Sequence, residues 1–321
     1  MTRARRAGAR GGAGRLELTH LGAAGWEISD GERVILLDPY LSRLRYRGRF
    51  GSQDAPSAPG DRRPVYGPDD PLAPDIAIID AHVRRADFIL HSHSHFNHTL
   101  DMPHIARKTG AVVIGTESTT NLARAGGVDP SRLLTVRGGE DYAFDGFSVR
   151  VIPSLHSALR GKLHFDSRVI PADFRGPRTM DDDVEGGTLA YLLRLGGHEI
   201  LWFGSMNFIE REVDGLRPDI AMIAAARQRL EIHDYTGRLM RALGRPRLVF
   251  ATHWDEQSFP LGAPQDLRLA EAAVFVREVK AVSPRTRVIV ARHLERHVVD
   301  GGRPARAAGS AARRKGSRRG R

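Results

Sequence analysis

Three short apolar runs, separated by glycine or Asp-Gly turns, open the part of this sequence that can fold, and they restrict it to a sheet-based architecture. The runs are RLELTHLG (15–22), GWEIS (25–29) and RVILLDPY (33–40). Their length, their apolar content and the turns between them predict β-strands that pair with their sequence neighbours. Because such a sheet must cover its apolar face, we expect a layered protein.

Farther along the chain, the predicted strands alternate with predicted helices. Further strands are expected at 87–90, 111–116, 187–195, 198–203, 219–224, 247–251 and 287–291, with three more inside 133–157. Helices are expected at 74–86, 101–110, 117–126, 208–214, 232–243 and 264–278. Asp101 is expected to cap the helix that follows it. This order predicts an α/β (α+β) fold with two largely antiparallel sheets and helices on the outside.

The formal net charge of +11 is concentrated at the two ends of the chain. Residues 1–15 carry five Arg, residues 303–321 carry seven Arg and one Lys, and neither segment has an acidic residue. The 36 basic and 38 acidic groups of residues 16–302 leave that part near neutral. We expect disordered basic tails at 1–15 and 301–321 around one domain at 16–300. Nucleic-acid binding by the domain is not expected, although the tails could bind phosphates non-specifically.

The chain has no cysteine, which excludes disulfides and thiolate metal sites. No apolar run approaches the roughly 20 residues that a membrane span requires. The basic N-terminus is not followed by an apolar segment of the kind found in secretory signals. A cytoplasmic protein is therefore expected, and the sequence does not indicate its oligomeric state.

The stretch HSHSHFNHTLD (91–101) places four of the chain's 14 histidines within eight positions, directly after a predicted buried strand. Side chains at strand ends are held by a rigid scaffold and often carry function. Local spacing allows two sets of metal ligands. One uses His91 and His93, and the other uses His93 and His95 with Asn97 and His98 beyond them.

Three more polar residues follow predicted strands. His156 ends VIPSLH, Ser205 follows ILWFG, and His253 follows LVFAT. Because each strand must be buried, these side chains are expected to meet at one edge of the sheets. Histidines that converge in this way predict a zinc site of the catalytic type, with three protein ligands and an open position.

The motifs THLGAAGWEI, VILLDPY, SHSHFNH, PSLHS, FGSMN and THWD occur in an order that resembles the metallo-β-lactamase fold superfamily. They look closest to its broad bacterial branch of metal-dependent hydrolases related to ascorbate-6-phosphate lactonase. The resemblance covers roughly residues 16–260. It implies a four-layer αββα sandwich, in agreement with the expected elements.

The resemblance also selects one set of ligands. The family motif His-x-His-x-Asp-His maps onto His93, His95, Asn97 and His98, which places His91 outside the ligand set. The implied ligands of the first metal are His93, His95 and His156. Those of the second metal are Asn97, His98 and His253. Ser205 stands where the family has a bridging Asp, and Asp38 matches an Asp that supports the metal loop through hydrogen bonds.

Two departures from the family pattern change the expected metal content. Asn97 and Ser205 both replace carboxylates, and two cations without a bridging carboxylate would repel each other. We expect one tightly held zinc ion at the three-histidine site and a weak or empty second site. His98 and His253 are candidates for orienting water and accepting its proton. We favour His253 as the proton acceptor because Asp255 is near it in the sequence.

The expected function is a zinc-dependent hydrolase of a small molecule, acting on an ester, lactone, amide or phosphodiester. The first alternative is a degenerate member of the superfamily that keeps one metal as a binding or regulatory module. The second is a nuclease, which the near-neutral domain disfavours.

The segment 158–186 is long and irregular, and we expect it to shape the substrate pocket. Its cationic side chains are available for an anionic group: Arg160, Lys162, His164 and Arg175. The acidic run Asp181–Asp183 is expected to be solvated. His20 is expected to pack in the core rather than to bind metal.

Overall fold

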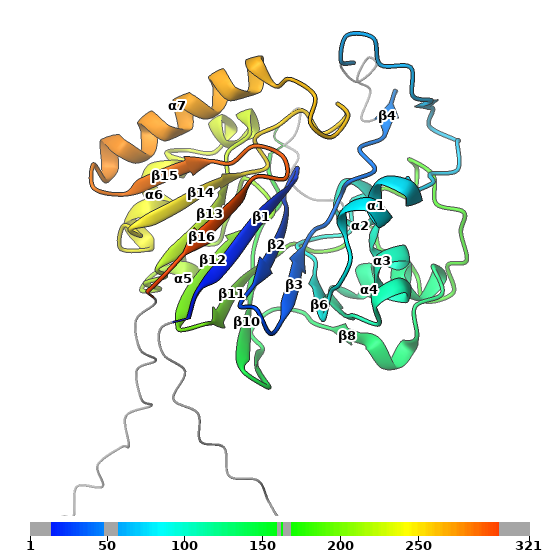
Figure 1. Cartoon of the computed structure of the whole chain (residues 1–321), viewed down its shortest axis with the longest axis horizontal. Helices are drawn as coiled ribbons and strands as arrows, with labels where there is room; N and C mark the ends of the chain where they lie inside the picture. Colours follow the sequence, from blue (N-terminus) through cyan, green and yellow to red (C-terminus); the bar gives the residue numbers. More distant parts are fainter. Residues whose placement is uncertain (1–13, 48–56, 159–161, 163–167, 302–321) are drawn as a thin grey trace, which may run out of the picture.

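The computed structural model describes residues 14–47, 57–158, 162 and 168–301. Two seven-stranded sheets form its centre (Figure 1). The first sheet runs in the order β16 (Arg296–Val299), β1 (Leu16–Gly22), β2 (Gly25–Ser29), β3 (Val34–Leu37), β6 (Phe88–Leu90), β7 (Val112–Gly115) and β8 (Leu133–Thr135). The second runs β15 (Arg287–Val290), β14 (Leu248–Thr252), β13 (Ile220–Ala224), β12 (His198–Phe203), β11 (Leu189–Leu195), β10 (Phe147–Pro153) and β9 (Asp141–Phe144).

The main core lies between the two sheets and is built from the inward residues of both. Strand β1 alternates buried and half-buried positions over Leu16–Thr19, as a strand with one covered face should. The largest buried side chains of this core are aromatic: Trp26, Tyr191, Trp202 and Phe250. The indole Nε1 of Trp26 donates to Thr252 Oγ1 at 2.9 Å and thereby ties the sheets together.

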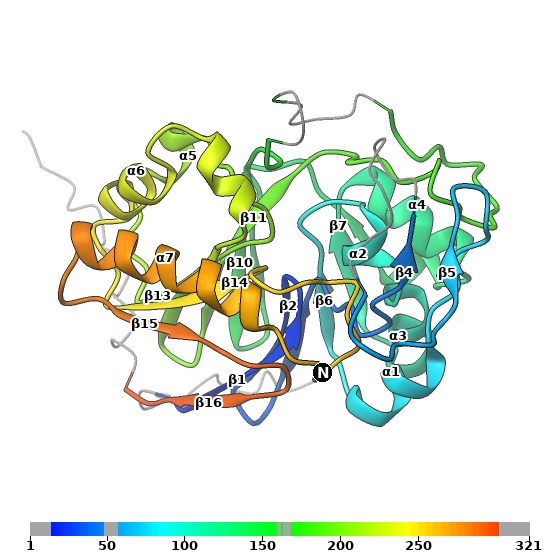
Figure 2. The same cartoon turned by 90° about the horizontal axis from the view of Figure 1, so that it is seen from above.

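Helices cover the outer face of each sheet, so the molecule has four layers (Figure 2). The first sheet is covered by α1 (Ile76–His82), α3 (Met102–Thr109) and α4 (Glu117–Ala125), through side chains such as Ile79, Ile105 and Leu122. The second is covered by α5 (Glu210–Val213), α6 (Tyr235–Ala242) and α7 (Asp266–Val282), through side chains such as Leu239 and Phe275. The expected αββα sandwich is confirmed. The sheets are mixed rather than largely antiparallel, because β3, β6, β7 and β8 pair in parallel in the first sheet and β12, β13, β14 and β15 do so in the second.

Several small elements differ from the expectation. Strand β16 was not predicted, and it pairs with β1 from Leu16↔Val299 onward. A two-stranded pair, β4 (Arg45–Tyr46) and β5 (Val65–Tyr66), interrupts a region expected to be irregular. The remaining short elements are α2 (Phe96–Thr99) and 3-10 turns at Pro130–Arg132 and Arg227–Glu231. Within the described residues, no helix is long and apolar enough to cross a membrane.

Helix α1 ends at His82, four residues before the expected end, because Val83 turns into the core in an extended conformation. Helix α3 begins after Asp101 as expected, but the Asp101 side chain does not cap it. Its carboxylate accepts hydrogen bonds from the backbone N–H groups of Leu41 and Ser42 instead. The expected capping role of Asp101 is therefore wrong, because a nearby loop supplies other donors.

Candidate metal centre

The strand directions bring the motif residues to one edge of the sandwich. In the first sheet, β3, β6, β7 and β8 are parallel, so their carboxyl ends lie at the same edge. In the second sheet, β12, β13 and β14 are parallel, and β10 points the same way because β11 runs antiparallel to both β10 and β12. The polar residues that follow β3, β6, β10, β12 and β14 are thereby collected together.

The imidazole rings of His93, His95 and His156 converge at this edge. Their ligand nitrogens all lie within 4.8 Å of one another, and all three side chains are buried. The Nε2 atom of His93 is 3.1 Å from Nδ1 of His95. Two imidazole ligands on one tetrahedral zinc ion would have nitrogens about 3.3 Å apart. The same distance suits a hydrogen bond between the two rings, so the three rings fit a metal ion without requiring one.

Hydrogen-bonding neighbours lie beside one ring nitrogen of His156 and one of His93. His156 Nδ1 donates to the backbone oxygen of Ser157 at 3.0 Å, which presents Nε2 as its ligand atom. His93 Nδ1 lies 2.9 Å from the hydroxyl of Ser92, on the opposite side of the ring from His95. Burial, and the neighbouring histidines, hold the pKa of His93 well below its usual range. The ring is therefore neutral near pH 7, which is the state that binds metal.

Asp38 lies behind the histidines and fixes the metal loop (residues 91–98). Its carboxylate accepts from the backbone N–H of Ser92 at 2.9 Å and also from the Ser92 hydroxyl. It lies 3.2 Å from His91 Nδ1 and 2.6 Å from His98 Nδ1. Burial raises the pKa of this carboxyl, but His98 and His91 outweigh that effect and lower the pKa to about 2. Asp38 is thus positioned to hold the rings of His91 and His98 in place.

Asn97 and Ser205, which stand where the family has ligands of the second metal, form hydrogen bonds within the protein. Asn97 Nδ2 donates to Gln257 Oε1 at 2.7 Å, while the buried Oδ1 of Asn97 has no hydrogen-bond partner among the described residues. The Ser205 hydroxyl accepts from the backbone N–H of Ser157 at 2.9 Å and so braces the loop that carries His156. No carboxylate stands at either position.

His253 directly follows β14 with a left-handed φ of 48°, and its ring lies near that of His98, with 5.3 Å between the centroids. Burial, and then His98, lower its pKa to about 4. Asp255 is not its hydrogen-bond partner. The closeness of Asp255 to His253 in the sequence therefore does not support His253 as the proton acceptor. The Asp255 carboxylate instead lies 2.7 Å from the Arg43 guanidinium and 2.6 Å from His293 Nε2.

His20 is buried, as expected of a packing residue, and lies against Trp26. Its Nε2 atom is 3.3 Å from the backbone oxygen of Ala23. Burial lowers the pKa of His20 to about 4, which keeps the ring neutral. It takes no part in the groups that could hold a metal.

Asp183 corrects the expectation of a solvated acidic run. Its side chain is buried, and its Oδ1 accepts from the backbone N–H of Phe96, inside the metal loop, at 2.7 Å. The same atom lies 3.2 Å from Arg178, which is also buried. Neither residue could be identified from the sequence, because neither stands in a motif and both are about 80 residues beyond the loop they contact.

The cationic residues expected to bind an anionic group have other contacts where the structure describes them. Lys162 pairs with Glu231 on the surface. Arg175 is exposed and donates to the backbone oxygens of Ala172 and Phe174. Arg160 and His164 lie outside the described residues.

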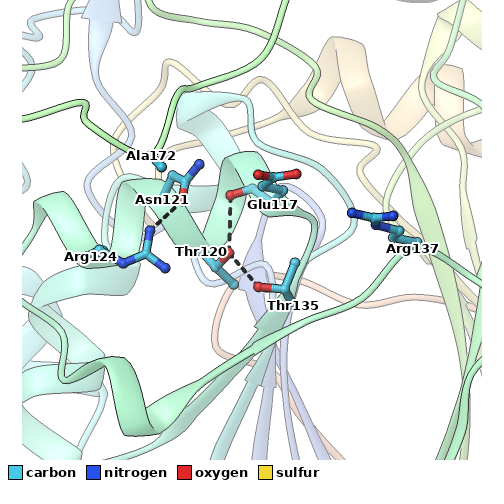
Figure 3. Close-up of a pocket in the computed structure, with 7 residues that line it drawn as sticks. All are labelled: Glu117, Thr120, Asn121, Arg124, Thr135, Arg137 and Ala172. Atoms are coloured by element: carbon cyan, nitrogen blue, oxygen red, sulfur yellow. Dashed lines mark hydrogen bonds between the residues drawn. The ribbon is translucent and has the colours of Figure 1, made fainter.

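A cavity of about 340 Å³ lies beside α4 and the end of β8 (Figure 3). Its lining is mostly polar and includes Glu117, Thr120 and Arg137. In Figure 3, Thr120 bridges Thr135 and the backbone of Glu117. A second cavity of about 280 Å³ lies between α3, α4 and residues 174–178. The histidines of the metal centre line neither cavity.

Comparison with known proteins agrees with this architecture. A metal-dependent hydrolase from Staphylococcus aureus is 26% identical over 202 residues, which cover 62% of this chain and 80% of the relative. A relative of the same name from Pyrobaculum islandicum is 26% identical over 147 residues, 46% of this chain and about half (53%) of its own length.

Solved structures share the fold at low sequence identity. An isothiocyanate hydrolase from Delia radicum gut bacteria superposes with a TM-score of 0.56 at 15% identity, covering 89% of this chain and 100% of that one. Igni18, a metallo hydrolase from Ignicoccus hospitalis, gives a TM-score of 0.55 at 14% identity, covering 89% and 99%. A family model described as the beta-lactamase superfamily domain matches residues 17–253. The chain therefore belongs to the metallo-β-lactamase superfamily.

Proposed function

We propose that this protein is a metal-dependent hydrolase whose zinc ion is held by His93, His95 and His156. The convergence of three buried imidazoles, with nitrogens within 4.8 Å of one another, carries the proposal. The names of the relatives, which are metal-dependent hydrolases, support it. When bound, zinc supplies Lewis acidity, which polarises the scissile bond and makes water more acidic.

His98 and His253 are the proposed proton-handling groups. The Asp38 carboxylate accepts from His98 Nδ1, so Nε2 is the nitrogen of this ring that is left to exchange a proton. His253 is neutral near pH 7 because its pKa is about 4, and its Nδ1 has no hydrogen-bond partner among the described residues. His98 Nε2 and His253 Nδ1 are therefore the nitrogens that would accept a proton and pass it to a leaving group.

We further propose that the second metal position is weak or empty. Asn97 offers an amide where a carboxylate would balance a cation's charge, and its Nδ2 is held by Gln257. The Ser205 hydroxyl already accepts from Ser157 N–H. Neither residue can bridge two cations as a carboxylate does.

The proposed substrates are small molecules with an ester, lactone, amide or phosphodiester bond. The test is turnover of one representative of each by the full chain, before and after chelation and after zinc is restored. We expect activity that chelation abolishes, that zinc restores, and that His93→Ala lacks. His104→Ala is the matched control, because His104 pairs with Asp80 on the surface.

A binding or regulatory module is the second candidate, favoured by the absence of carboxylates at Asn97 and Ser205. It predicts that the full chain binds zinc but turns over none of the four substrates. Zinc binding without turnover would therefore replace the hydrolase proposal with this one, and turnover that survives chelation would refute both.

A further inference from the structure

One segment of the chain, residues 178–186, lies against the metal loop and contacts its backbone at several points. Ser94, the residue between two proposed ligands, donates its backbone N–H to Glu185 O at 2.9 Å and its hydroxyl to Val184 O at 2.7 Å. The loop between β6 and α2 has no regular secondary structure to fix it. Its buried backbone groups must find their partners elsewhere, and this segment supplies several of them.

Arg178, at the beginning of this segment, also contacts the loop. Its guanidinium donates to Ser94 O at 2.5 Å and to Thr99 Oγ1 at 2.8 Å, and it pairs with Asp183 at 3.2 Å. The planar fork of an arginine can hold three acceptors in fixed directions, which a lysine cannot do. Arg178 thereby connects the start of the metal loop with the end of α2.

Asp183 completes the arrangement by binding the residue after His95. Its Oδ1 accepts from Phe96 N–H at 2.7 Å, and only 2% of the residue is exposed. A hydrogen bond to a charged acceptor is roughly twice as strong as one between neutral groups. Arg178 and Asp183 therefore form hydrogen bonds with the backbone on both sides of His95, at Ser94 O and at Phe96 N–H.

We propose that Arg178 and Asp183 are positioning residues that set the affinity of the metal site. They act on the ligands through the loop backbone, at Ser94 O and at Phe96 N–H. A buried ion pair contributes little to stability, because desolvation offsets the attraction between its charges. Holding one loop conformation, with His93 and His95 at metal-binding distance, is the role that their contacts support. This inference rests on the proposed metal site.

The test is zinc affinity of the full chain, measured by competition with a chromophoric chelator, in Asp183→Asn and Arg178→Gln. Asp183→Asn keeps the shape and removes the charge. We expect zinc to dissociate about 10- to 100-fold more readily, as is usual when groups behind metal ligands are changed. The absorption bands of bound cobalt should also shift, because the ligand geometry relaxes. Arg194→Gln, at the exposed pair with Asp141 and Glu199, should leave both readouts unchanged.

Urea unfolding of the metal-free proteins separates positioning from general destabilisation. If Arg178→Gln does not fold, Thr99→Val removes one Arg178 contact, together with the bonds from this hydroxyl to Ser94 O and His95 O, and it is expected to weaken zinc binding to a smaller degree. Unchanged zinc affinity and cobalt spectra in folded Asp183→Asn and Thr99→Val would overturn the positioning role. A wild-type chain that binds no zinc would instead refute the metal site itself, so the two failures are distinguishable.

Discussion

His93 Nε2 and His95 Nδ1 lie 3.1 Å apart, although the side chains come from a loop with no regular hydrogen-bonding pattern. Two unprotonated nitrogens at this distance would repel each other, so they need either a shared proton or a shared metal ion. His156 reaches the same point from the other sheet.

Asn97→Asp is expected to strengthen the second metal position. A carboxylate at this position adds a negative charge next to His98 in the chain, and it replaces the amide that donates to Gln257. We expect additional zinc to bind per chain in equilibrium dialysis. Asn97→Ser, which removes the amide without adding charge, is the control. An unchanged metal content in Asn97→Asp would show that the amide is not what keeps the second position weak.

Gly204→Ala is expected to disturb the support of the metal loop. An added Cβ would lie 2.2 Å from Ser92 Oγ and 2.6 Å from Asp38 Oδ2, although the Gly204 backbone is not left-handed. Overpacking of this kind costs about 1–3 kcal/mol. We expect lower stability in urea unfolding together with weaker zinc binding.

The control for that substitution is Gly67→Ala. There the nearest neighbour of the new Cβ is Asp70 Oδ2 at 3.3 Å, and Arg47 Nε follows at 3.8 Å, so it meets only the ends of side chains. This variant should be close to wild type in both measurements. If Gly204→Ala also left urea unfolding and zinc binding unchanged, the close packing of Ser92 and Asp38 against Gly204 would not contribute to stability or to metal binding.

Asp101 should make the protein less stable as the pH rises from about 4 to 6. Burial raises its pKa to about 6, although hydrogen bonds from Ser42 and Leu41 oppose the shift. Between the unfolded pKa of about 4 and this value, the folded state binds more protons, so stability falls with rising pH. The loss is on the order of 3 kcal/mol.

Asp101→Asn should remove this dependence. The informative quantity is the difference in unfolding free energy between wild type and variant, measured in urea from pH 4 to pH 7 without metal. We expect wild type to lose stability relative to the variant as the pH rises. A difference that stays constant, or that grows in favour of wild type, would contradict the raised pKa.

The sequence was sufficient to predict the layers, because these depend on local pattern. An apolar strand followed at once by polar residues can be read directly, as in the runs that precede His91, His156 and His253. The choice of His93, His95 and His156 as ligands came from the family resemblance, and it stays a prediction. Parallel strands then bring such ends to one edge whatever their sequence separation.

The supporting contacts could not be predicted in the same way. Arg178 and Asp183 belong to an irregular segment, and only the folded chain shows that they meet Ser94 and Phe96. Asp255 is close to His253 in sequence but turns to Arg43 and His293. In both cases, long-range packing decides the partner of a buried charge, and no local spacing encodes it.

The zinc content of the purified full chain after exhaustive dialysis, measured together with that of His156→Ala and His104→Ala, is a direct test of the one-metal site. We predict one tightly held zinc ion per chain in wild type and in His104→Ala, and none in His156→Ala. Wild-type protein that retains no zinc, that retains two ions, or that retains as much as His156→Ala would contradict it.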